Sequence, residues 1–175
     1  MRIGIDIDDT LVSTTKVLKK LWKKYSSDKF PNNIEDLKDS NIARFWSIYR
    51  SDITYNNSFK FNAIKVVNKL KQQGNVICII TRRSRERNIN LEDNLKKWFN
   101  NNNLLFDEIY TDASNKGKLC KDKNIDLLVD DLYENIISCI NEDVKVILFN
   151  KNKDYKGLKT TSWNKVYKMI MEDLC

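Results

Sequence analysis

The chain has 175 residues, enough for one domain with a sizeable core, and 41% of them are hydrophobic, which is typical of a folded globular protein. It contains no histidine, which excludes catalysis by a Ser-His-Asp triad or a Cys-His pair and zinc sites that need imidazole. The net charge of +7 is compatible with anionic ligands, but no basic tail or arginine-rich block indicates nucleic-acid binding.

Glycine and cysteine usage excludes further classes. The four glycines form neither a GxGxxG fingerprint nor a P-loop, which argues against dinucleotide or Walker-type binding. The four cysteines lack CxxC spacing, as expected for free thiols in a reducing compartment. No signal-peptide pattern and no run of about 18 apolar residues is present, so we expect no membrane span and a cytoplasmic protein.

The first residues predict a buried strand that ends in acid. Isoleucine occupies alternate positions from 3 to 7, and Asp6, Asp8 and Asp9 lie within four positions at the carboxyl end of this segment. Carboxylates this close repel unless a cation lies among them or one of them holds a proton. The cluster therefore indicates a functional site, although a single aspartate here could instead cap the helix expected from Leu11.

Two amphipathic helices are expected next, over 11–27 and 34–50. The lysines of the first could attract phosphate or could form a solvated helix face. Phe45, Trp46 and Tyr49 in the second could stack on a flat substrate or could belong to the core. We interpret residues 13–57 as an insertion between the first strand and the rest of the chain.

The remainder alternates helical and strand-like segments, which predicts an α/β fold with a parallel sheet. The expected helices cover 59–73, 86–99, 116–124, 132–141 and 162–173, and the expected strands cover 75–81, 107–111, 125–129 and 145–149.

Polar clusters stand at strand ends or open the following helix. They are Asp6 with Asp8, Thr81 with Arg82, Lys116, and Asp130 with Asp131. Ligands of open parallel sheets bind outside the carboxyl ends of the strands, so we expect these clusters to converge. Carboxylates suit a hard cation, and cationic groups and hydroxyls suit phosphate, which together predict magnesium-assisted phosphoryl transfer.

At these residues the chain resembles the haloacid dehalogenase (HAD) superfamily of phosphatases. The run Asp6-Ile-Asp8-Asp9-Thr10, then Thr81, Lys116 and Asp130-Asp131 match its motifs in order. The segments IGIDIDDTL, ITRR, VDDLYEN and SWNKVY are most similar to the 5′(3′)-deoxyribonucleotidase-like group. The resemblance implies a Rossmann-like three-layer core with parallel strand order 5-4-1-2-3, formed by 1–12 and 58–175, and a small helical cap formed by 13–57.

The resemblance also implies catalytic roles. Asp6 would attack phosphorus and form an aspartyl-phosphate, and Asp8 would protonate the leaving alkoxide and then take a proton from water. Thr81 would hold phosphate oxygens. Lys116 would offset charge on the nucleophile and phosphate, with Lys118 as an alternative.

The same resemblance implies Mg²⁺ as cofactor. It would be held by Asp6, the backbone carbonyl of Asp8, and Asp130, with Asp131 acting directly or through water.

The expected function is that of a Mg²⁺-dependent phosphomonoesterase for a small phosphate ester, most simply a nucleoside monophosphate. The substrate contacts would be Thr81, Arg82 and the aromatic residues Phe45, Trp46 and Tyr49, with Arg83 as an alternative to Arg82. Competing interpretations are a phosphatase for nucleic-acid ends or sugar phosphates and a non-catalytic phosphate-binding protein.

Overall fold

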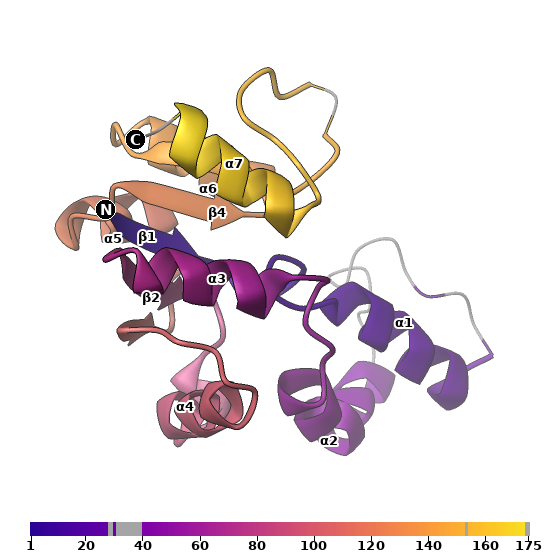
Figure 1. The fold of residues 1–175 in the computed structure, drawn as a ribbon. Helices are drawn as coiled ribbons and strands as arrows, with labels where there is room; N and C mark the ends of the chain where they lie inside the picture. Colours follow the sequence, from indigo (N-terminus) through magenta and orange to yellow (C-terminus); the bar gives the residue numbers. More distant parts are fainter. Residues whose placement is uncertain (28–29, 31–39, 153, 174–175) are drawn as a thin grey trace.

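A computed structural model describes residues 1–27, 30, 40–152 and 154–173 of the chain. Its centre is a five-stranded sheet in the order β3-β2-β1-β4-β5, with every neighbouring pair parallel (Figure 1). The strands are β1 (Arg2–Ile5), β2 (Val76–Ile80), β3 (Glu108–Tyr110), β4 (Leu127–Asp130) and β5 (Lys145–Leu148). The predicted α/β class and strand order are therefore confirmed.

Helices cover both faces of this sheet (Figure 1). α3 (Ala63–Gln72) and α7 (Trp163–Asp173) lie on one face, and α5 (Lys116–Asp122) and α6 (Tyr133–Ile140) lie on the other. α4 (Leu91–Asn101) packs into the same core cluster as α3 and α7, after the short 3₁₀ turn η2 (Arg85–Arg87). The result is the predicted three-layer arrangement.

The central strand alternates between these two cores. Ile3 and Ile5 pack with α3 and α7, whereas Gly4 faces the opposite layer. A Cβ at Gly4 would lie 2.7 Å from the Cδ1 of Ile80 and 3.2 Å from the Cδ1 of Leu128. Glycine at this position therefore leaves room for side chains of the neighbouring strands to pack directly against β1.

Of the helices whose predicted starts lie within the described residues, three start three or more residues later than predicted, and the first of them, expected over 11–27, begins at Thr14. The helix expected over 59–73 begins only at Ala63, because Asn62 has a left-handed φ of 61°, and Phe61 before it is 86% exposed. The helix expected over 86–99 begins at Leu91, after η2. The last two segments follow connections whose backbone leaves the helical region, which apolar periodicity alone does not reveal.

α1 (Thr14–Tyr25) and α2 (Ser40–Tyr55) lie together beside the sheet as a helical pair (Figure 1). They share a separate hydrophobic cluster that includes Leu18, Trp22 and Phe45. The predicted second helix covered 34–50; its residues 34–39 lie outside the described part of the chain.

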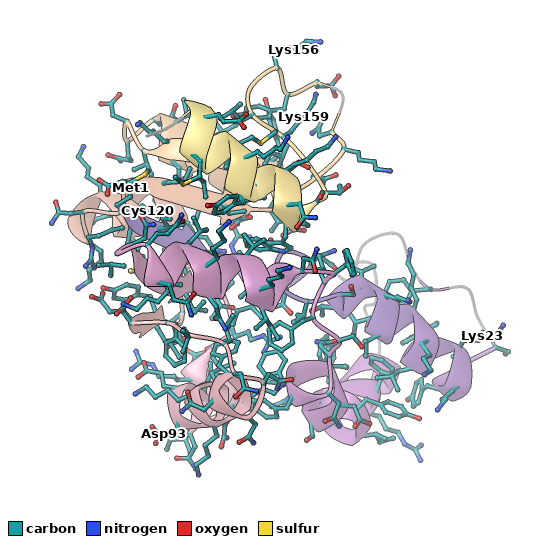
Figure 2. All side chains as sticks on the ribbon, viewed as in Figure 1. Met1, Lys23, Asp93, Cys120, Lys156 and Lys159 are labelled. Atoms are coloured by element: carbon teal, nitrogen blue, oxygen red, sulfur yellow. The ribbon has the colours of Figure 1, made fainter. Side chains whose placement is uncertain are left out.

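The two connections between the helical pair and the sheet run alongside each other. The N–H of Ser13 donates to the carbonyl of Ser58 at 3.2 Å, and the N–H of Lys60 donates to the carbonyl of Leu11 at 2.8 Å. The lysines of α1 are exposed, and Lys23 points outward from the far end of the helix (Figure 2). No helix within the described residues is long and apolar enough to cross a membrane.

Candidate active site

A tight turn after β1 positions the first acidic residues. The N–H of Asp6 donates to the carbonyl of Val129 at 3.0 Å, which continues the pairing of β1 with β4. The carbonyl of Ile7 accepts the N–H groups of two residues beyond the turn, and Asp9 within it has a φ of 53°. Aspartate adopts this left-handed conformation more readily than most residues. Asp6 is thereby held at the carboxyl edge of the sheet with 6% of its surface exposed.

Lys116 connects two strand ends in the interior. Its Nζ lies 2.5 Å from the Oδ1 of Asp6 and 2.6 Å from the Oδ2 of Asp130, and it also donates to the carbonyl of Ile80 at 3.1 Å. Three acceptors thus use all three N–H groups of an ammonium that is 1% exposed. Burial lowers the pKa of Lys116, but the charges of Asp6 and Asp130 outweigh this effect and raise it overall. Lys116 therefore remains charged.

The alternative lysine, Lys118, is exposed. Its position follows from the start of α5, where the Oδ1 of Asn115 accepts the backbone N–H of Lys118 at 3.0 Å. Lys116 is the first helical residue and lies on the buried side. Of the two predicted candidates, Lys116 contacts the carboxylates.

Asp130 has donors on both carboxylate oxygens. In addition to Lys116, it accepts the N–H of Leu132 at 2.9 Å and the Nδ2 of Asn135 at 2.9 and 3.0 Å. Asn135 is 2% exposed and was not among the predicted site residues. The sequence feature that could have identified Asn135 is its position five residues after Asp130, among the buried residues of α6. These bonds orient Asp130 toward the ammonium.

Asp131 has a different environment from its neighbour. Its Oδ1 accepts a long hydrogen bond of 3.4 Å from the Oγ1 of Thr10. Burial, together with the charges of Asp6, Asp130 and Asp9, raises the pKa of Asp131 to about 8. Burial, followed by the charges of Asp130 and Asp8, raises the pKa of Asp6 although Lys116 opposes this shift. This end of the site therefore carries excess negative charge.

Asp8 is bound on both oxygens. Arg83 donates from Nε to Oδ2 at 3.0 Å and from Nη2 to Oδ1 at 2.9 Å, and Thr14 donates from Oγ1 to Oδ1 at 2.5 Å. Burial raises the pKa of Asp8, but the charge and hydrogen bonds of Arg83 lower it overall. The predicted role for Asp8 needs its protonated form in the first step, whereas this arrangement favours the ionised form.

Thr81 and Arg82 follow β2, whose Ile79 pairs with Ile5 of β1. Thr81 is 1% exposed, and its Oγ1 accepts the backbone N–H of Arg83 at 3.2 Å. Arg82 is exposed and donates from Nη2 to the Oδ1 of Asn135 at 2.6 Å. Thr81 lies at the predicted strand end, and Arg82 contacts a residue that holds Asp130.

The aromatic residues predicted to contact substrate form part of the helical pair. Phe45 is 2% exposed, and its ring centroid lies 5.2 to 6.0 Å from those of Trp22, Tyr25, Trp46 and Tyr49. This burial favours the core alternative for Phe45, because a side chain enclosed by four rings presents little surface to a ligand. Trp46 and Tyr49 are half-buried against the same cluster.

The oxygen ligands available at this site are of the kind that a hard cation prefers. Asp6, Asp130 and Asp131 supply carboxylate oxygens, and one ammonium, that of Lys116, offsets part of their charge. As the side chains stand, no group of three or more acidic or thiol side chains in the described residues is arranged to hold a metal. The Nζ of Lys116 lies between Asp6 and Asp130, and the raised pKa of Asp131 reflects a negative charge that a cation would neutralise.

Comparisons with known proteins support the architecture. No protein-family model and no curated protein matches the chain. Solved structures do match over nearly the whole length. A predicted phosphatase from Clostridium acetobutylicum is 16% identical, with 98% of each chain covered and a TM-score of 0.66. A predicted phosphoglycolate phosphatase from Haemophilus somnus 129PT is 16% identical, with 96% of each chain covered and a TM-score of 0.66.

A third structural neighbour is the HAD hydrolase YfnB from Bacillus subtilis bound to magnesium. It is 11% identical, with 97% of each chain covered and a TM-score of 0.62. At these identities the likeness concerns the fold. The five-stranded parallel sheet, its strand order and its helical layers therefore identify the architecture of this chain as the fold of the HAD-superfamily hydrolases.

Proposed function

We propose that the protein is a Mg²⁺-dependent phosphomonoesterase that transfers the phosphoryl group of a small ester to Asp6 and then to water. The observation that carries this proposal is the buried ammonium of Lys116, held between Asp6 and Asp130 at the carboxyl edge of the sheet. A buried charge cluster of this kind costs folding free energy, and functional sites are where such costs are commonly met.

Asp6 is the proposed nucleophile. Lys116 binds its Oδ1 and fixes the carboxylate, and no hydrogen bond within the described residues engages its Oδ2. A carboxylate attacks phosphorus without first losing a proton, provided that positive charge keeps it ionised. Lys116 supplies part of that charge and would also offset charge on the transferred phosphoryl group.

Thr81 is proposed to bind phosphate. Its oxygen accepts the N–H of Arg83, so its own O–H remains free to donate to a phosphate oxygen. The backbone around Thr81 is fixed, because its N–H donates to Tyr110 at 2.9 Å and its carbonyl accepts from Ala113 at 3.0 Å.

Asp8 is proposed to exchange protons with the leaving oxygen and with water. In the structure its oxygens are held by Arg83 and Thr14. Proton transfer to an alkoxide therefore requires Asp8 to turn at least one oxygen away from Arg83.

A bound Mg²⁺ would be held by Asp6, the backbone carbonyl of Asp8, Asp130 and Asp131, and would supply neutralising charge and orient phosphate oxygens. For Asp130, this role requires one of its present donors to give way, because each of its oxygens already accepts two hydrogen bonds.

The proposed substrate is a small phosphate ester, with residues 13–57 acting as a cap. The nucleotide preference came from the resemblance to the 5′(3′)-deoxyribonucleotidase-like group, with Phe45, Trp46 and Tyr49 as candidate contacts to the base. Because Phe45 is buried, nucleoside monophosphates enter the proposal as one arm of a substrate panel.

The test is phosphate release from a panel of nucleoside monophosphates, sugar phosphates, short-chain phosphate esters and a phosphorylated oligonucleotide. We expect turnover with Mg²⁺, loss in EDTA, recovery on adding Mg²⁺, and a loss of at least about 10³-fold in Asp6→Asn. Chelator-insensitive turnover, or turnover retained in Asp6→Asn with an unchanged melting temperature, would refute the proposal.

A further inference from the structure

Arg83 occupies the space between Asp8 and the helical pair. Its Nε and Nη2 bind the two oxygens of Asp8 at 3.0 and 2.9 Å, and its Nη1 donates to the carbonyl of Thr54 at 3.0 Å. The guanidinium carbon lies 5.7 Å from the ring centroid of Trp98, within the range of a cation–π contact. The Arg83 side chain is 13% exposed. Arg83 is thus a specifically bound cation, unlike an ordinary surface arginine.

Hydrogen bonds of Arg83 and Asp8 connect the carboxyl edge of the sheet to both helices of the pair. Thr54 lies in the last turn of α2, where carbonyls lack partners within the helix. Thr14, the first residue of α1, donates to Asp8, and Asn57 donates from Nδ2 to the Oγ1 of Thr14 at 3.3 Å. The guanidinium therefore lies on the side of Asp8 that faces the proposed cap.

Neighbouring arginines do not share this position. Arg82 is exposed and binds Asn135, and Arg85 pairs with Asp112 at 2.9 Å with 62% of its side chain exposed. Among the ion pairs between described residues, Asp8 is bonded to Arg83 alone. Position and contacts, and not residue type, therefore distinguish Arg83 within the segment that follows β2.

We infer that Arg83 forms the leaving-group subsite and selects phosphate esters whose alcohol carries a second anionic group, a carboxylate or another phosphate. This inference rests on the proposed function. When Asp8 turns an oxygen toward the leaving alcohol, Arg83 loses an acceptor while it remains largely buried, and an unpaired buried cation is costly. A planar guanidinium binds carboxylate and phosphate equally well through two parallel hydrogen bonds. An anion on the leaving group replaces Asp8 as its partner.

The sharpest test uses two esters of the same length, the phosphate ester of glycolic acid and that of ethylene glycol. They differ in whether the end of the alcohol is a carboxylate or a neutral hydroxymethyl group. We expect the wild-type kcat/KM to be about 10- to 100-fold higher for the acidic ester, as for a charge-assisted hydrogen bond. Nucleoside 5′-monophosphates have a neutral leaving group, so their kcat/KM should be similar to that of the ethylene glycol ester.

Arg83→Gln should abolish this preference, chiefly by lowering kcat/KM for the acidic ester. Arg83→Lys keeps the charge but loses the fork, so it should retain part of the preference. Arg85→Gln removes a positive charge from the same segment and should retain the wild-type ratio. Melting temperatures establish that each variant is folded.

Equal wild-type kcat/KM values for the two esters, or an equal loss on both in Arg83→Gln, would overturn the role of Arg83 and leave the phosphatase proposal standing. Absence of Mg²⁺-dependent hydrolysis of every ester in the panel would overturn the proposed function and this inference with it.

Discussion

The carboxyl edge of the sheet and the α1–α2 pair both carry side chains that suggested function, but the two regions differ in what those side chains contact. At the sheet edge, charged groups from β1, β4 and α5 meet in the interior, where Lys116 binds Asp6 and Asp130. In the helical pair, the aromatic residues contact one another around Phe45. Buried charges need a functional explanation, whereas buried rings at helical spacing are sufficiently explained by packing.

The largest expected effect comes from removing the ammonium at the sheet edge. Lys116→Met leaves Asp6 and Asp130 without their shared counter-ion, so we expect phosphatase kcat/KM to fall by about 10²- to 10³-fold or more. The free energy of unfolding should fall by about 3–5 kcal/mol, because one partner of a buried ion pair is lost.

Lys118→Met is the matched control, since it makes the same substitution two residues away on an exposed side chain. It should change the unfolding free energy by no more than about 0.5 kcal/mol. Steady-state kinetics and denaturant unfolding of both variants check this contrast. A larger activity loss in Lys118→Met than in Lys116→Met would reverse the assignment of the catalytic lysine.

The next effect tests the helical pair. Phe45→Ala removes the ring at the centre of the aromatic cluster and should cost about 3–5 kcal/mol of unfolding free energy. Ile48→Ala, on the same helix but at a position where the side chain is 53% exposed, should cost much less. Under conditions where both variants are folded, KM should change less than about threefold. A large rise in KM at unchanged stability would instead make Phe45 a substrate contact.

The fold was predictable from sequence because its signals are local and repeated. Continuous apolar segments such as 76–80 and 127–129 predicted buried parallel strands, and the polar residues that end them fell on one edge. Once the strands are parallel, their carboxyl ends meet, which brings Asp6 and Asp130 within reach of one lysine. Topology therefore sufficed to predict that the two carboxylates converge, whereas the choice of Lys116 over Lys118 came from the resemblance.

The contacts of Arg83 and Asn135 were not predictable in the same way. Arg82 and Arg83 are adjacent and chemically identical, and only the turn after β2 decides which one meets Asp8, 75 positions earlier in the chain. Asn135 lies on a helix whose register, set by its start at Tyr133, directs its amide to Asp130. Such choices depend on the direction of single side chains, about which hydrophobic periodicity carries no information.

The effect that is smallest per pH unit separates Asp131 from carboxylates that are paired. Its pKa of about 8 lies above the ordinary aspartate value of 3.8, so the folded state binds the proton more tightly than the unfolded state. The stabilisation is complete below the ordinary pKa and is lost as the pH rises through about 8. In EDTA, the unfolding free energy should therefore fall between pH 5 and pH 8, by at most about 1.4 kcal/mol per pH unit for this group.

Asp131→Asn should flatten this slope, and Mg²⁺ should stabilise the wild type most at the alkaline end, where it neutralises the charge. Asp107→Asn supplies the control with the opposite sign. Burial raises the pKa of Asp107, but bonds from Lys71 and from the N–H of Ile77 lower it overall, so Asp107 is already ionised throughout this range. Its loss should lower stability equally at pH 5 and pH 8.

The measurement is denaturant unfolding of the wild type and both variants at pH 5 and pH 8 in EDTA. An unfolding free energy of the wild type that does not change with pH would mean that its neighbours do not raise the pKa of Asp131. A slope that persists in Asp131→Asn would assign the excess charge to Asp6, whose pKa is also raised by burial and by the charges of Asp130 and Asp8.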